Sequence, residues 1–80
     1  MTVLVRYYAG ARAAAGVSQE SVSAPTLAAL RTELTSRHEP RFATVLAACS
    51  FLVDGHATVD GATELSTGST VEVLPPFAGG

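Results

Sequence analysis

The chain has 80 residues, 48% of them hydrophobic and 15% charged, and a formal net charge of −2. This size corresponds to one domain, near the lower limit at which a single hydrophobic core suffices, and it leaves little room for an enzyme cleft. Five arginines, no lysine and a pI near 5.5 do not supply the basic surface that nucleic-acid binding requires.

The sequence shows no sign of a membrane-bound or exported protein. No stretch approaches the roughly 18 apolar residues of a membrane span, and the first residues lack the basic segment of a signal peptide. The single cysteine, Cys49, cannot form an internal disulfide, which fits a reducing compartment. We therefore expect a cytoplasmic protein that binds neither membranes nor nucleic acid.

The first two predicted elements are strands. The run 2–8 is rich in β-branched and aromatic residues and ends at Ala9 and Gly10. Alternation places Val3, Val5 and Tyr7 on one face and Leu4, Arg6 and Tyr8 on the other. After a turn of small residues around Gly16, the run 17–23 predicts a second strand, antiparallel to the first.

Two helices are predicted next. Thr26 is the expected N-cap of the main helix, in which Leu27, Leu30 and Leu34 form one apolar stripe. Glu33 and Arg37 are spaced for an ion pair, and Pro40 closes this helix. A shorter helix follows, with Phe42, Val45, Leu46 and Cys49 at the spacing of one buried face, so Cys49 is expected in the core.

The last third of the chain predicts strands. A hairpin joins 51–53 to 57–59 through the turn residues Asp54 and Gly55. A turn at Thr67 and Gly68 leads into the final strand, 70–74, with Val71 and Val73 facing the helices. The fold class is therefore α+β, a mixed sheet of about four to five strands packed on one main helix and a short second helix, in a domain spanning 1–75.

Pairing of the first and last strands would produce an apolar patch. The opposite face of the sheet would then gather Leu4, Arg6, Tyr8, Glu72 and Leu74. On so small a domain, such a patch indicates a surface for a protein partner.

The segment 76–80 is expected to be an extended tail. Pro75 and Pro76 favour a stiff exit from the last strand, and the tail could reach on the order of 15 Å. Gly79 and Gly80 give a thin backbone that can enter a narrow tunnel. A carboxylate on Gly80 could attack the α-phosphate of ATP on another protein and become an acyl-adenylate, open to sulfide, persulfide or an amine.

Other groups with potential chemistry are interpreted as structural. His38 and His56 lie far apart without a third ligand at metal spacing, so we expect no metal site. Asp54 and Asp60 are typical turn residues. Ser66, Ser69 and Thr70 have no histidine nearby in the sequence, so we assign no catalytic residue to the chain.

Three segments resemble the MoaD family, the ubiquitin-like small subunits of molybdopterin synthase. They are VLVRYYAGAR at the start, LSTGSTVEV before the last strand and, most specifically, LPPFAGG at the end. The resemblance implies a β-grasp fold and a sulfur carrier without a bound cofactor. A MoeB-type, E1-like enzyme would use ATP to adenylate Gly80, and a sulfurtransferase or other donor would then supply sulfur to form a thiocarboxylate.

The same resemblance implies a partner and a set of site residues. The charged carrier would dock on a MoaE-type large subunit, as a heterotetramer, and its sulfur would pass to cyclic pyranopterin monophosphate in molybdenum cofactor biosynthesis. By position, Gly80 carries the thiocarboxylate. The tail that enters the partner's active site consists of Gly79, Ala78, Phe77, Pro76 and Pro75. Phe77 stands where many members carry valine. Tyr8, Leu74, Leu4 and Arg6 fall on the docking patch, and Arg12 matches an arginine after the first strand.

Three alternatives stay open at this stage. The carrier could serve another acceptor, in thiamin thiazole formation, cysteine synthesis or tRNA thiolation. It could be a ubiquitin-like protein modifier, although without lysine the chain cannot form polymers of itself through lysine isopeptide bonds. It could also be a plain interaction domain.

Overall fold

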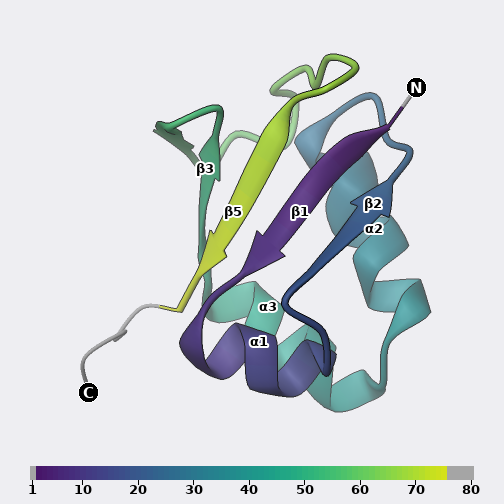
Figure 1. Ribbon diagram of the computed structural model, residues 1–80, viewed down its shortest axis with the longest axis vertical. Coiled ribbons are helices and arrows are strands. Elements are labelled where there is room, and N and C mark those ends of the chain that lie inside the picture. Colours follow the sequence, from purple (N-terminus) through teal and green to yellow (C-terminus); the bar gives the residue numbers. More distant parts are fainter. Residues whose placement is uncertain (1, 76–80) are drawn as a thin grey trace.

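The computed structural model describes residues 2–75, which form a five-stranded sheet and three helices. The elements are β1 (Val3–Tyr7), α1 (Ala9–Ala15), β2 (Gln19–Val22), α2 (Leu27–Arg37), α3 (Pro40–Ala48), β3 (Ser50–Val53), β4 (His56–Thr58) and β5 (Thr70–Leu74). The strand order is β2-β1-β5-β3-β4, in which only β1 and β5 are parallel. Figure 1 shows β1 and β5 side by side at the centre of the sheet. This is the predicted β-grasp arrangement.

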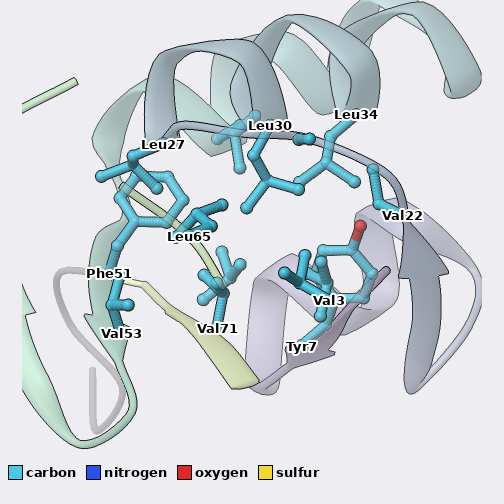
Figure 2. Packing of buried hydrophobic residues seen from close by; sticks show 14 of the residues in the cluster. Val3, Tyr7, Val22, Leu27, Leu30, Leu34, Phe51, Val53, Leu65 and Val71 are labelled. Atoms are coloured by element: carbon cyan, nitrogen blue, oxygen red, sulfur yellow. The ribbon is translucent and has the colours of Figure 1, made fainter. Parts of the chain in front are cut away.

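The hydrophobic core lies between the helices and one face of the sheet. Burial alternates along β1 and β5, so that Val3, Val5, Val71 and Val73 are almost completely buried. Figure 2 shows Leu27, Leu30 and Leu34 of α2 directed toward these strands, and all three leucines are fully buried. The predicted leucine stripe is therefore confirmed.

The local signals around α2 are also confirmed. The Thr26 hydroxyl oxygen accepts a hydrogen bond from the backbone N–H of Ala29 at 3.2 Å, as an N-cap does. Arg37 Nε and Glu33 Oε2 are 3.1 Å apart. Pro40 follows the end of α2, as predicted, and is itself the first residue of α3, where the missing N–H is not needed.

The predicted hairpin forms between β3 and β4. Asp54 and Gly55 have φ angles of 50° and 85°, so both occupy the left-handed region that a two-residue hairpin of type I′ requires. The Asp54 carboxylate accepts a hydrogen bond from the Thr70 N–H at 2.9 Å, which lowers the pKa of that carboxyl group. The second strand of the hairpin lies one residue earlier than predicted, because it runs from His56 to Thr58 and leaves Val59 exposed.

The first connection corrects the sequence prediction. We predicted a turn of small residues after β1, whereas Ala9–Ala15 forms a helix that buries Ala11. Alanine has the highest helix propensity, so a run of small residues suits a helix as well as a turn. Gly16, with a φ of 80°, ends α1 through a hydrogen bond from its N–H to the Arg12 carbonyl. The helix occupies chain that we assigned to the turn, and β2 is correspondingly shorter than predicted.

The shorter predicted helix, which is α3 in the structure, differs from the prediction at its end. Cys49 lies one residue beyond α3 and is half-buried rather than fully buried, because its backbone has already turned to extended geometry. Within residues 2–75, no helix is long and apolar enough to cross a membrane. The expected tail, 76–80, lies outside the described residues.

Candidate functional site: the outer face of the sheet

The face of the sheet that points away from the helices carries a mostly apolar patch. We define the outer face as Leu4, Arg6, Tyr8, Leu52, Glu72 and Leu74. Leu4 and Arg6 lie on β1, beside Thr70 and Glu72 of the parallel strand β5. All six side chains are at least partly exposed, because none of the helices within residues 2–75 covers this side of the sheet. The predicted gathering of residues from the first and last strands is thus present.

A tyrosine and a glutamate are joined at the middle of the outer face. The Tyr8 hydroxyl donates to Glu72 Oε2 at 2.6 Å across the β1–β5 pair. This hydrogen bond to the carboxylate raises the pKa of Tyr8. Arg6 is the register neighbour of Glu72, yet the two side chains form no ion pair among the contacts of residues 2–75.

Leu52 belongs to the outer face although the sequence analysis did not include it. It pairs with Glu72 in the antiparallel β3–β5 register, so Glu72 lies between Arg6 and Leu52 across three strands. The alternation of Phe51, Leu52 and Val53 could have indicated which face Leu52 takes. Only the position of β3 next to β5 places it in the same patch.

The remaining predicted docking and tail residues lie in different places. Arg12 is exposed on α1, beyond the end of β1, where it borders a shallow depression with Ala13 and Val17 rather than the sheet face. Leu74 ends β5, and Pro75 is the last described residue. The predicted tail residues Pro76, Phe77, Ala78, Gly79 and Gly80 lie outside the described part of the chain.

A second tyrosine–glutamate pair lies on the inner side of the sheet. The Tyr7 hydroxyl donates to Glu20, whose carboxylate also contacts His38 Nε2 at 2.7 Å and Arg37 Nη1 at 3.1 Å. Burial raises the pKa of Glu20, but the hydrogen bonds from Tyr7, His38 and Arg37 outweigh it, so the pKa is lowered overall. This inner cluster, which sequence reasoning missed, joins β1 and β2 to the end of α2.

The described residues offer little for catalysis. The Cys49 thiol donates to the Val45 carbonyl at 3.2 Å, and burial raises its pKa, which makes it a poor nucleophile. Ser69 is buried and its hydroxyl oxygen accepts the Ser66 N–H, and Asp60 accepts the Ala62 N–H, so both stabilise turns. No group of three His, Cys, Asp or Glu residues within 2–75 could hold a metal ion.

The comparisons with known proteins identify one family. A sequence model of the ThiS family matches residues 5–80. A comparison with curated protein sequences found no match.

Several solved structures share the fold. A Pyrococcus furiosus protein assigned as molybdopterin converting factor subunit 1 is 30% identical, with a TM-score of 0.83 over 95% of this chain and 98% of that chain. The Helicobacter pylori complex of subunits 1 and 2 of molybdopterin-converting factor contains a chain 25% identical, with a TM-score of 0.78 and full coverage of both chains. The Haloferax volcanii small archaeal modifier protein 1 is 18% identical, with a TM-score of 0.84 and full coverage of both, and shows the fold alone.

Proposed function

The chain belongs to the ThiS family, and from this premise we propose that it is a sulfur carrier for molybdopterin synthesis, with its sulfur held as a thiocarboxylate on Gly80. The observation that carries the proposal is the match of the family model as far as Gly80. The match includes Gly79 and Gly80 in the segment LPPFAGG.

The proposed chemistry requires a second protein. An oxygen of the Gly80 carboxylate attacks the α-phosphate of ATP, and pyrophosphate leaves to give the acyl-adenylate. A sulfide or persulfide sulfur then attacks the acyl carbon and expels AMP. When the donor is a persulfide, the resulting acyl disulfide must also be cleaved by a thiol, which reduces the S–S bond, releases the thiocarboxylate and forms a disulfide with the donor's sulfur. An E1-like activating enzyme would bind the ATP, and a sulfurtransferase or other donor would supply the sulfur.

The outer face supports docking of this carrier on a larger subunit. Its three leucines are partly exposed, and one of them, Leu74, ends the strand that leads directly to Pro75, so a partner bound there lies beside the start of the proposed tail. A relative with 25% identity is part of a complex of subunits 1 and 2 of molybdopterin-converting factor. We propose an equivalent large subunit here, with cyclic pyranopterin monophosphate as the sulfur acceptor and catalytic residues on that subunit.

Intact-mass spectrometry tests the carrier chemistry. The purified chain is incubated with ATP, a MoeB-type activating enzyme and a sulfur source. We expect a mass gain of about 16 Da, because one terminal oxygen is replaced by sulfur. The matched control is a chain with one alanine added after Gly80, in which the glycine carboxylate is blocked. No mass gain with an activating enzyme proven on its own carrier, or an equal gain in the extended control, would contradict the proposal.

A ubiquitin-like modifier is the second candidate. The fold likeness to small archaeal modifier protein 1, with TM-scores of 0.84, favours it at the level of the fold. Because the chain has no lysine, it could modify targets singly but could not build lysine-linked chains of itself. Isopeptide-linked conjugates that appear in cell extracts with the normal chain, and disappear when Gly80 is deleted, would support this candidate over the sulfur carrier.

A further inference from the structure

The charged residues of the outer face are not neutralised within the described part of the chain. Glu72 receives one hydrogen bond, from Tyr8 to Oε2, and the contacts of residues 2–75 include no donor to its Oε1. Arg6 is exposed and has no hydrogen-bond or ion-pair partner among the same residues. Both groups therefore rely on water in the free protein.

Covering this face with an apolar surface would remove that water. A charged group that loses water without gaining a partner opposes binding, and Glu72 is already half-buried between Leu52 and Arg6. The leucines of the outer face favour a protein partner, whereas the two charges oppose a partner that is apolar throughout. The surface is satisfied only by a partner with polar groups at these two points.

We infer that the large subunit that docks on the outer face presents a cationic side chain to Glu72 and an acidic side chain to Arg6. This inference rests on the proposed function. Adjacent strands are about 4.8 Å apart, so the partner's two groups must be similarly close and in the opposite order of charge. A large subunit that suits a carrier with apolar residues at these positions would leave both charges unpaired, so the pair selects the cognate subunit.

Neutral variants test the two charges separately. Glu72→Gln removes the negative charge but keeps an oxygen acceptor for the Tyr8 hydroxyl. Arg6→Gln removes the positive charge on the neighbouring strand β1. Their matched controls are Glu64→Gln, in the loop before Leu65, and Arg41→Gln, on α3, both exposed and away from the outer face. Binding of each to the purified molybdopterin synthase large subunit of the same organism is measured by calorimetry at low salt.

We expect each outer-face variant to weaken binding roughly tenfold and each control to leave it unchanged. The inference would be overturned if Glu72→Gln and Glu64→Gln bound the large subunit with equal affinity. It would also be overturned if Arg6→Gln and Arg41→Gln had equal affinities. Thermal unfolding of all four variants checks that the fold is intact. We expect little change, because Glu72 is only half-buried and the other three side chains are exposed.

The double variant Arg6→Glu/Glu72→Arg tests whether binding depends on the order of the two charges or only on their sum. It keeps the net charge of the chain and reverses only the order of the two groups. We expect binding to stay at least roughly tenfold weaker than that of the normal chain, because each charge then faces its own sign. Recovery of normal affinity would show that only net charge matters and would overturn the inference.

The mass-spectrometric test keeps this inference distinct from the proposed function. Normal sulfur loading with no charge-dependent difference in large-subunit binding would overturn the inference alone. Failure of the normal chain both to load sulfur and to bind the large subunit would overturn both. Association of the chain with itself through this face, seen as an Arg6- and Glu72-dependent dimer by sedimentation with no large-subunit binding, would also overturn it.

Discussion

Two adjacent tyrosines show how differently the two faces of this sheet are used. Tyr7 and Tyr8 each donate a hydroxyl hydrogen bond to a glutamate, Glu20 and Glu72 respectively. Tyr7 is 3% exposed at the edge of the core. Its pKa is raised well above the usual range, mainly by burial and to a smaller extent by the hydrogen bond to Glu20. Tyr8 is partly exposed on the outer face, where the bond to Glu72 is the main cause of its raised pKa.

The glutamates differ in how many partners they have within the described chain. Glu20 is held by Tyr7, His38 and Arg37, which join two strands to the end of α2. Among residues 2–75, Glu72 is held only by Tyr8. The inner pair is therefore complete and stabilises the fold, while the outer pair keeps hydrogen-bonding capacity for a partner. The variants below test this division, from the largest expected effect to the smallest.

Leucines on the two sides of the sheet provide the largest contrast. Leu30→Ala is expected to lower the free energy of unfolding by about 2–5 kcal/mol, because it leaves a cavity at a fully buried position. Leu4→Ala, on the outer face, should cost about 1 kcal/mol or less. Urea denaturation of both variants measures the difference. Equal losses would show that the outer face is also part of the core.

Leu74→Glu, on the outer face, is expected to affect partner binding rather than stability. The side chain is half-buried on the outer face, so the variant should fold normally. Binding to the large subunit should weaken by about 2–3 kcal/mol, because an unpaired charge enters an apolar interface. Calorimetry gives the affinity, with Thr44→Glu on the exposed side of α3 as the control. Unchanged affinity would remove Leu74 from the docking surface.

The two tyrosine hydroxyl groups can be removed individually. Tyr7→Phe should lower the free energy of unfolding by about 1–2 kcal/mol, because Glu20 loses a hydrogen bond at a largely buried position. Tyr8→Phe should leave stability nearly unchanged, since water can replace the hydroxyl beside Glu72. Equal effects in urea denaturation would contradict the division between the two pairs.

The inner carboxylate should also contribute a pH-dependent stability. Because the folded pKa of Glu20 lies below its ordinary value, its contribution is present above about pH 4.3 and is lost as the pH falls through the lower folded pKa. We expect the free energy of unfolding of the normal chain to exceed that of Glu20→Gln by about 1 kcal/mol near pH 7, and the difference to shrink as the pH falls below about 4.3. Urea midpoints across this range measure it. A constant difference would mean that the carboxylate charge is not what stabilises the cluster.

The sequence was sufficient where a residue's signal is local. Thr26, the leucine stripe of α2 and the turn dipeptide Asp54-Gly55 were all predicted, because each depends on neighbours within a few residues. The helix α1 was missed, because alanine and glycine are compatible with a turn as well as a helix. That ambiguity was resolved only by burial of Ala11 against the rest of the core.

Whether residues far apart in the chain could be predicted to lie together depended on knowing the strand order. Leu4, Arg6, Tyr8, Glu72 and Leu74 could be grouped because alternation assigns each a face and the first and last strands were expected to pair. Leu52 was missed, since its place beside Glu72 requires β3 to be the other neighbour of β5. The Glu20–His38 contact was missed for the same reason, because no local pattern relates residues on β2 to the end of α2.

By itself, the sequence determined which residues can form strands and helices, which side of each faces the core, and the family to which the chain belongs. These properties follow from backbone periodicity and from side-chain chemistry. The tertiary structure alone decided that Glu20 is enclosed by three donors and that Glu72 keeps an oxygen without a donor among residues 2–75. The physical reason is that hydrogen bonding and burial depend on which strands and helices become neighbours, and that choice is made by packing of the whole core.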